Sequence, residues 1–375
     1  MVFIGILVPI IIMGLVGIYI HNFIRRILEL IIKDNNIKYK RKINFILTLV
    51  IMVPAFYLFG IWSLVILHVF FISILIDCLY FVVNRILRKK NRIFEKIYKS
   101  GVISFTVVTL LLGYGYMNMQ NVIETNYNIY TDKNIRDDGY KIAFISDLHY
   151  GLNMNGQKLN EYCNEIEKKK PDMVILGGDI VDESTTLVEM QEAFNILSQI
   201  KSTYGTFYVY GNHDKSIYSL KHNYSVEQLD EAINNSGITI LADNSFNIND
   251  EITITGRKDR TFDGVSVRKS AQELADDTNI DENKYNILAD HQPREFEELS
   301  NAGYDIMLSG HTHGGQIWPG GLFIKTFMKD TLNYGHTKNN NMDIIVSSGI
   351  AGWGYPIRTE KHCEYVVVNI VKDDI

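Results

Sequence analysis

The sequence is poor in cysteine, with three in 375 residues. Cys78 lies within an apolar segment, which leaves only Cys163 and Cys363 as a potential pair. A disulfide framework of the kind that holds small secreted domains together needs more cysteines than this. We therefore expect unpaired cysteines, and cysteine usage does not indicate a cellular compartment.

Acidic residues are scarce in the first 120 residues. That region has 14 Lys and Arg against four acids, a balance of +10, and the remainder has 23 against 39, a balance of −16. The net charge of −6 therefore hides a basic, apolar region followed by an acidic one. The acidity of the second region argues against binding to a nucleic-acid backbone.

The first 120 residues contain long apolar runs. Residues 2–20 form a run of 19 without a charge, and at about 1.5 Å per helical residue this length crosses a bilayer core. A cleavable signal peptide is excluded because a basic segment before the run and a small-residue cleavage site are both missing. Residues 43–83 are too many for one span and contain Pro54 and Gly60. We expect a membrane domain over residues 1–120 with four transmembrane helices, at about residues 2–20, 43–59, 61–83 and 102–119.

Basic residues gather in two of the loops between these spans. The first loop has Arg25, Arg26, Lys33, Lys38, Lys40, Arg41 and Lys42, and the third has Arg85, Arg88, Lys89, Lys90, Arg92, Lys96 and Lys99. Short loops rich in Lys and Arg stay in the cytoplasm. Four spans then give a multi-pass protein of the cell membrane with both chain ends, and the domain after residue 120, on the extracytoplasmic side.

The remaining residues show the pattern of an α/β domain. Residues 121–138 are polar without periodicity and are predicted to be a linker, followed by a domain over residues 139–375. Short, continuous apolar runs predict strands buried on both faces, at residues 142–145, 173–176, 207–210, 287–289, 306–308, 344–346 and 365–368. Helical spacing occurs at about residues 156–169, 187–200, 226–235, 270–276 and 294–301. This alternation favours an α/β or layered α+β sandwich.

Polar clusters directly follow five of these predicted strands. They are Asp147-Leu148-His149, Gly178-Asp179, Gly211-Asn212-His213-Asp214, His291 and Gly310-His311-Thr312-His313. Ligand sites in such folds collect at the carboxyl ends of strands. Five of the ten histidines lie in these clusters, which disfavours the alternative that they are ordinary polar surface loops.

The residue types in the clusters suit two metal ions. Asp147 and His149 are two positions apart at a strand end, so both side chains can point to the same side. Asp179 follows two glycines that let the backbone come close, and its two carboxylate oxygens can bridge two cations. Oxygen and imidazole ligands without thiolate favour Mn, Fe or Zn. Two such ions can clamp a phosphoryl group and acidify the water between them.

Taken together, these motifs closely resemble the calcineurin-like metallophosphoesterase family, and within it the membrane-associated bacterial phosphodiesterase branch. The resemblance covers roughly residues 139–371, and the run from Gly310 to Gln316 is its most specific part. It implies a sandwich of two mixed β-sheets flanked by helices, and phosphoester hydrolysis through a hydroxide that bridges two divalent ions.

The resemblance also implies residue roles that spacing alone does not give. It assigns Asp147, His149, Asp179 and His313 to the first ion, and Asp179, Asn212, His291 and His311 to the second. It places His213 against the phosphate rather than a metal. Asp182 resembles the acid that orients this histidine, with a solvated carboxylate or a helix cap as the alternative. Asp290 is expected to cap the following helix rather than to tune the second ion.

The expected substrate is a phosphodiester or pyrophosphate in a lipid or cell-envelope metabolite. The membrane domain and the apolar run 322–328, which is either core or a lip that meets the bilayer, motivate this expectation. An extracytoplasmic phosphomonoesterase or phosphoprotein phosphatase remains an alternative. So does a membrane sensor that binds metal and phosphate without turnover. The sequence indicates no protein partner.

Overall fold

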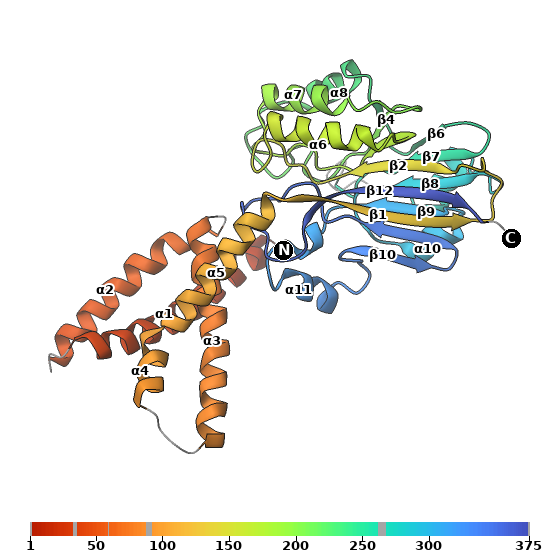
Figure 1. The fold of residues 1–375 in the computed structure, drawn as a ribbon. Coiled ribbons are helices and arrows are strands. Elements are labelled where there is room, and N and C mark those ends of the chain that lie inside the picture. The colour runs from red at the N-terminus through yellow and green to blue at the C-terminus, as the bar shows by residue number, and fades with distance from the viewer. Residues whose placement is uncertain (1, 33–35, 59, 88–91, 262–267, 374–375) are drawn as a thin grey trace. The chain divides into compact units, whose positions relative to one another are not determined.

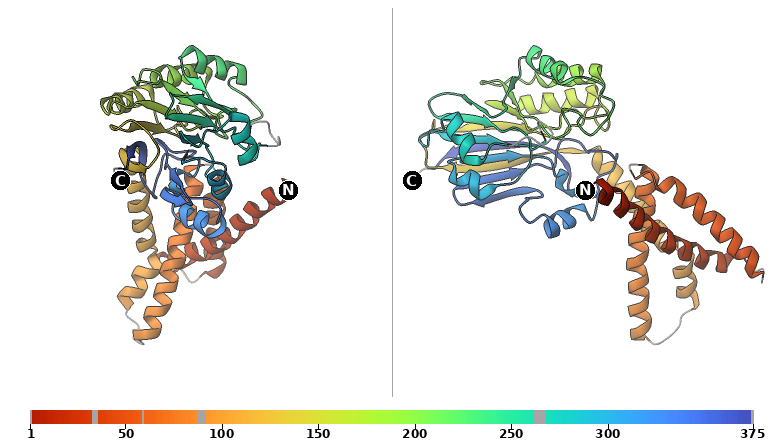
Figure 2. Two further views of the ribbon diagram at one scale, coloured as in Figure 1. Left: turned by 90° about the vertical axis from the view of Figure 1, so that its right-hand side faces the viewer. Right: turned by 180° about the vertical axis from the view of Figure 1, so that it is seen from behind.

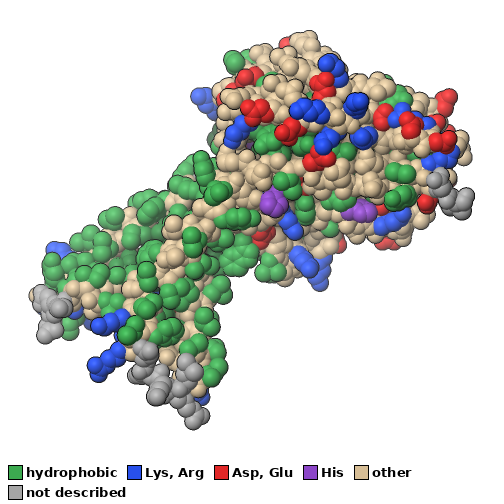
Figure 3. All heavy atoms as spheres, viewed as in Figure 1, with side chains coloured by type: hydrophobic (Ala, Val, Ile, Leu, Met, Phe, Trp, Pro, Cys, Tyr) green, Lys and Arg blue, Asp and Glu red, His purple; other side chains and the backbone are tan. Residues whose placement is uncertain are grey.

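A computed structural model describes residues 2–32, 36–58, 60–87, 92–261 and 268–373. The chain divides into two compact units, Met1–Tyr114 and Gly115–Ile375. Hydrophobic side chains gather over the helices of the first unit, whereas charged side chains crowd the surface of the second (Figure 3). This difference matches the long apolar runs of the first 120 residues and their absence from the rest of the sequence.

The first unit consists of helices (Figure 1). Their bounds are α1 Val2–Ile31, α2 Ile37–Ala55, α3 Ile61–Leu87, α4 Arg92–Ser100 and α5 Val102–Met119, the last of which ends within the second unit. Among the described residues, three helical segments are long and apolar enough to cross a membrane: Pro9–Ile31, Ile61–Ile86 and Val102–Met119. The prediction of four spans is thus supported for three of them.

The second predicted span corresponds to α2, which has 19 residues but not the composition of a membrane helix. Its first six residues include Lys38, Lys40, Arg41 and Lys42. The apolar remainder, residues 43–55, extends only about 20 Å at about 1.5 Å per residue, against a hydrocarbon core of about 30 Å. The helix ends at Ala55, before the end of the predicted span at residue 59, which lies outside the described residues.

Asp77, the acid within α3, is held in a polar cluster. Its carboxylate lies 2.7 Å from Arg26 Nη1 and accepts hydrogen bonds from the hydroxyls of Tyr19, at 2.7 Å, and Tyr98, at 2.9 Å. An ion pair with these additional donors compensates a carboxylate for lost hydration. Asp77 therefore connects α1, α3 and α4.

The second unit contains two six-stranded mixed sheets, as expected. Sheet A has the order β1-β12-β2-β3-β4-β5 and sheet B the order β10-β11-β9-β8-β7-β6. The strands of sheet A are β1 Val122–Thr131, β2 Tyr140–Ile145, β3 Met173–Leu176, β4 Thr206–Tyr208, β5 Thr239–Ile240 and β12 Cys363–Lys372. Those of sheet B are β6 Asn244–Asn247, β7 Ile252–Gly256, β8 Tyr285–Ala289, β9 Ile306–Ser309, β10 Gly335–Asn339 and β11 Met342–Val346.

Helices cover the outer faces of the two sheets (Figure 2). They are α6 Gly156–Lys168, α7 Leu187–Leu197 and α8 Val226–Asn235 on sheet A, and α9 Ala271–Thr278 and α10 Phe296–Asn301 on sheet B. Along β2, Ile142 and Phe144 enter the core between the sheets, and Ala143 and Ile145 enter the core beneath the helices. Burial on both faces explains why the predicted strands are continuous apolar runs.

The predicted linker is wrong for residues 122–131, which form strand β1. This strand pairs in parallel with β12 over its whole length, from Val122 opposite Cys363 to Thr131 opposite Lys372. Toward its end β1 alternates between the exposed residues Asn126, Asn128 and Tyr130 and more buried residues, and it is the edge strand of sheet A. Its partner lies about 240 residues away in sequence, so local periodicity carries no trace of the pairing. The described cysteines are all free, as predicted.

Candidate metal centre

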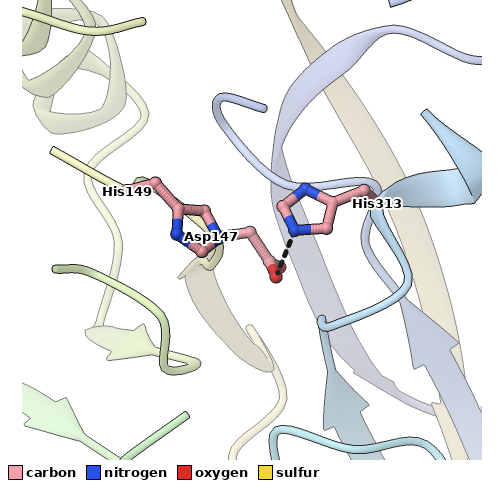
Figure 4. Close-up of side chains that lie close together, drawn as sticks. All are labelled: Asp147, His149 and His313. Atoms are coloured by element: carbon pink, nitrogen blue, oxygen red, sulfur yellow. Dashed lines mark ion pairs between the residues drawn. The ribbon is translucent and has the colours of Figure 1, made fainter. Parts of the chain in front are cut away.

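The strand ends bring the polar clusters into two groups of side chains. Asp147 and His149 follow β2, Asp179 follows β3, His291 follows β8, and His311 and His313 follow β9. Potential ligand atoms lie within 4.8 Å of one another in each group, Asp147 with His149 and His313, and Asp179 with His291 and His311. We call these the first and the second group. Figure 4 shows the first, with Asp147 between the two imidazoles.

The backbone at these positions is unusual. Asp147, His149, Asp179, His311 and His313 all have positive φ, between 42° and 73°. Such a conformation costs a non-glycine residue of the order of 1 kcal/mol or more and persists only where the surroundings impose it. The tight sheet ends therefore hold these five side chains in orientations that ordinary strands do not provide.

Two glycines allow the loops to approach one another. A Cβ on Gly178, which has φ +87°, would lie 2.5 Å from the backbone nitrogen of Gly211, and a Cβ on Gly310 would lie 2.2 Å from Asp147 Oδ2. Neither position can accept a side chain without displacement of the candidate ligands. These close approaches explain sterically why the motifs have glycine at both positions.

Side chains outside the first group support it, Asp182 at the His149 ring and Arg358 at the His313 backbone. His149 Nδ1 lies 3.1 Å from Asp182 Oδ2, and His313 Nε2 lies 3.5 Å from Asp147 Oδ1. Arg358, which is fully buried, donates from Nη1 to the His313 carbonyl oxygen at 2.8 Å. A carboxylate behind a histidine fixes the ring and makes it a better metal ligand.

The second group is oriented by main-chain and amide groups. His291 Nδ1 donates to the Gly177 carbonyl oxygen at 2.8 Å, which directs Nε2 toward Asp179 Oδ2 at 3.0 Å. His311 Nδ1 lies 2.8 Å from Asn212 Oδ1. Asp179 Oδ2 also lies 3.8 Å from His149 Nε2 of the first group. Asp179 therefore stands between the two groups.

Several buried nitrogens in these groups fit metal coordination. Among the described residues, His149 Nε2 and His313 Nδ1 have no hydrogen-bond partner, and His291 Nε2 faces only the Asp179 carboxylate. Leaving a buried polar atom unsatisfied costs free energy, and a cation is the partner that suits an imidazole lone pair beside carboxylates. The donors are only oxygen and nitrogen, which fits divalent ions such as Mn, Fe or Zn.

The electrostatics of the protein alone also favour positive charge at the site. Burial opposes ionisation of Asp179, but His291 beside it holds the pKa of the carboxyl well below its usual range. Burial similarly opposes protonation of His291, but the charge of Asp179 raises the His291 pKa well above its usual value. Burial and nearby His291 lower the pKa of His311 to about 4. The carboxylates thus draw one proton onto His291, and a divalent cation can replace that proton.

Asp214, the last residue of the Gly-Asn-His-Asp cluster, fastens two ligand loops together. Its carboxylate accepts hydrogen bonds from the backbone amides of Asp179, Ile180, Val181 and Gly211 at 2.6–3.1 Å. Burial and the neighbouring charge of Asp179 raise the pKa of Asp214 to about 6. The structure therefore gives Asp214 a positioning role that the sequence alone did not reveal.

His213 contacts Glu183 and not Asp182. Glu183 Oε2 lies 2.9 Å from His213 Nδ1, whereas the Asp182 carboxylate faces His149 and accepts hydrogen bonds from Ser184. The prediction that Asp182 orients His213 is therefore wrong. The hydrogen bond to Ser184 fixes the turn so that the neighbouring acids 182 and 183 serve different histidines.

The surroundings of His213 suit a proton donor. Burial opposes its protonation, but the hydrogen bond to Glu183 and the charge of Asp179 raise its pKa above the ordinary value. The rings of Tyr218 and Trp353 lie 5.0 and 5.2 Å from the His213 ring, centroid to centroid.

The C-terminal segment 353–362 connects the first group to the last turn of α5. Asn118 Nδ2 donates to the carbonyl oxygens of Arg358 and Lys361, at 3.0 and 2.5 Å, and the Arg358 amide donates to the Gly115 carbonyl at 2.9 Å. Arg358 in turn reaches the His313 carbonyl. Sequence motifs gave no signal for this connection, because its residues are far apart along the chain.

Asp290 does not cap the following helix. Its fully buried carboxylate pairs with Arg268 and lies 3.5 Å from Arg257 Nη1. The N-cap position of α10 is Glu295, without a side-chain cap. Asp290 points away from His291 because adjacent residues at a strand end alternate in direction.

Comparison with known proteins agrees with this geometry. Residues 140–315 match the family described as calcineurin-like phosphoesterase. An uncharacterized metallophosphoesterase of Helicobacter pylori is 34% identical over 61% of this chain and 59% of its own length. Another from Aquifex aeolicus is 29% identical over 70% of this chain and 97% of its own length. A zebrafish transmembrane protein with metallophosphoesterase domain is 26% identical, over 62% and 53%.

Residues 140–315 are therefore a calcineurin-like metallophosphoesterase domain. The matched region spans less than two thirds of the Helicobacter relative. Among solved structures, a dimetal phosphatase from Danio rerio is similar over 63% of this chain and 94% of its own, with 12% identity and a TM-score of 0.42.

Proposed function

We propose that the protein is a membrane-anchored, dinuclear metal-dependent phosphoesterase that cleaves a phosphodiester or pyrophosphate bond. The observation that carries this proposal is the position of Asp179 between two groups of buried ligands. Asp147, His149, Asp179 and His313 would hold one ion, and Asp179, Asn212, His291 and His311 the other. When bound, the two ions supply charge stabilisation for a phosphoryl group and acidify a water molecule.

His213 is the residue proposed to protonate the leaving oxygen. Glu183 contacts Nδ1 of His213. This contact sets the direction of the ring and leaves Nε2 as the nitrogen proposed to act on the substrate. The hydrogen bond to Glu183 and the charge of Asp179 raise the pKa of His213 above its ordinary value, which favours the protonated imidazole that a general acid requires. Glu183 orients the His213 ring, and Asp182 orients the His149 ring.

The proposed substrate is a lipid or a cell-envelope metabolite with a lipid part. Helix α11, Gly320–Phe327, begins seven residues after His313, and its Gly321 amide donates to Glu360 Oε2 at 2.7 Å. Leu322, Phe323 and Phe327 are 60%, 59% and 70% exposed, so the apolar run is not core. An exposed apolar helix close to a catalytic loop fits contact with acyl chains.

Substrate preference tests this proposal. Detergent-dispersed phospholipid, lipid-linked pyrophosphate, a soluble nucleotide and a phosphorylated peptide are offered to the full-length protein with Mn. We expect the lipid substrates to be cleaved fastest, and Leu322→Ser to slow them while cleavage of bis-p-nitrophenyl phosphate is unchanged. Val188→Ser, at a side chain on α7 that is 72% exposed, is the control. Preference for soluble monoesters or phosphopeptides would favour a phosphatase, and metal binding without turnover of any substrate would favour a sensor.

The membrane orientation is proposed from charge. The segment that precedes α5 carries Arg92, Lys96 and Lys99, and basic segments stay in the cytoplasm, so α5 would carry the chain outward. The same rule favours α2 as a fourth span with its cations at the cytoplasmic end, where long side chains reach the interface. A reporter fused after Ile375 tests this. Activity on the outer side supports it, and cytoplasmic activity contradicts it.

A further inference from the structure

A groove lies between α1 and α2 in the first unit. It encloses a cavity of about 620 Å³, to which each helix contributes one face. His21, Arg25, Leu28 and Glu29 line it from α1, and Ile37, Lys40, Arg41, Asn44 and Phe45 from α2. The groove therefore combines a cationic rim with apolar walls.

Two polar residues of the lining, His21 and Asn44, contact each other, and Asn44 is buried. Asn44, which is 3% exposed, donates from Nδ2 to the His21 carbonyl oxygen at 3.2 Å and lies 2.9 Å from His21 Nε2. These contacts fix the orientation of the amide, and Asn44 Oδ1 has no hydrogen-bond partner among the described residues. A buried acceptor of this kind lacks the donor that it needs.

The rim is positively charged. Arg25, Lys40 and Arg41 against Glu29 give 3 − 1 = +2 among the lining residues. The pairing of Arg25 with Glu29 is long, at 3.9 Å, and both side chains are more than half exposed. A contact of this kind contributes little and does not prevent Arg25 from binding an anion.

The apolar walls determine which anion fits. Ile37 and Phe45 are 65% and 58% exposed, and α1 contains the membrane-capable segment Pro9–Ile31. A small soluble anion makes no use of such walls, whereas a phospholipid brings acyl chains for them and a phosphate for the rim. Basic pockets between membrane helices bind anionic headgroups in this way.

We propose that this groove binds an anionic phospholipid whose headgroup carries a hydroxyl, of which phosphatidylglycerol is the probe. The phosphate contacts Arg25, Lys40 and Arg41, the headgroup hydroxyl donates to Asn44 Oδ1, and the acyl chains lie along Leu28 and Phe45. This site is separate from the metal centre and does not depend on the proposed phosphoesterase activity.

Lipid binding to the full-length protein tests the proposal. Native mass spectrometry in detergent measures the affinity for phosphatidylglycerol, phosphatidylcholine and soluble glycerol phosphate. We expect phosphatidylglycerol to bind most tightly. Each cation near the headgroup contributes a factor of about five, so Lys40→Gln with Arg41→Gln should weaken binding about 25-fold. Equal affinity for phosphatidylcholine, or tight binding of glycerol phosphate alone, would overturn the proposal.

The same helix supplies a matched control. Lys38 and Lys42 are exposed on α2 and do not line the groove, so Lys38→Gln with Lys42→Gln removes the same charge from a neighbouring surface. We expect this pair to retain most of the affinity. A loss as large as that of the Lys40 and Arg41 pair would show diffuse attraction and no site. Asn44→Asp places a carboxylate next to the bound headgroup. It should weaken binding although the rim keeps all of its cations.

Discussion

The two ligand groups are supported in different ways. In the second group, His291 is oriented by the backbone carbonyl of Gly177 and His311 by the side chain of Asn212, and both of these residues follow strands of sheet A. The first group depends on the side chains of Asp182, behind the His149 ring, and Arg358, which donates to the His313 backbone carbonyl. The backbone contact to His291 cannot be deleted by a substitution, whereas the Asp182 and Arg358 side chains can be removed singly. The first ion should therefore be the more sensitive of the two to distant substitutions.

The largest expected effect comes from Asp179→Ala. Asp179 stands between the two groups, so its loss should weaken the binding of both ions at once. Charge stabilisation by metal ions amounts to several kcal/mol, so we expect kcat to fall by roughly 1000-fold or more. Hydrolysis of bis-p-nitrophenyl phosphate by full-length protein with Mn measures this. Activity close to that of the unaltered protein would show that Asp179 does not connect the groups.

A smaller loss is expected for His213→Gln. General acid catalysis contributes about 100-fold or more, and His213 is not in either ligand group, so both ions should stay bound. Metal content and kcat measured on the same sample separate the two roles. Metal loss in this variant would make His213 a ligand. Glu183→Gln, which leaves the imidazole in place, should lower kcat less.

Asp182→Asn is expected to weaken the binding of one ion and not of the other. Removal of the carboxylate behind a metal-binding histidine lowers metal affinity about 10- to 100-fold, and Asp182 contacts only His149 of the two groups. The hydrogen bonds from His149 and Ser184 outweigh burial and hold the Asp182 pKa at about 2, so the carboxylate is charged at any working pH. Mn titration should show one weakened site and one unchanged site. Equal weakening of both would contradict the difference in support.

The smallest effect is expected at the last turn of α5. Asn118→Ala removes hydrogen bonds to the segment that carries Arg358. A hydrogen bond contributes about 1 kcal/mol, so affinity for the first ion should fall about fivefold. Met117→Ala, at a side chain 73% exposed on the same turn, is the control. If both variants bind Mn alike, the last turn of α5 does not support the first group.

The sequence predicted ligands correctly where they directly follow a predicted strand. Asp147, Asp179 and His311 each follow a short apolar run, so strand ends and ligands could be predicted together. The sequence was uninformative where a contact depends on turn geometry or on distant pairing. Asp182 and Glu183 are adjacent, and only the turn at Ser184 decides which histidine each one meets. Arg358 lies in no motif and reaches His313 through folding alone.

The membrane region shows the same limit. Hydropathy located α3 and α5 closely, because uninterrupted apolar length is a local property. It did not reveal that α1 continues to Ile31, so that Arg26 lies within the helix and pairs with Asp77. The prediction of an ion pair between two helices requires knowledge of which helices pack together.

Electron paramagnetic resonance of Mn bound to the full-length protein tests the central claim most directly. Two groups with Asp179 between them should bind two Mn ions per chain close enough to give a spin-coupled signal. Asp179→Ala should abolish the coupling. A single uncoupled Mn ion per chain at saturation would contradict a dinuclear centre.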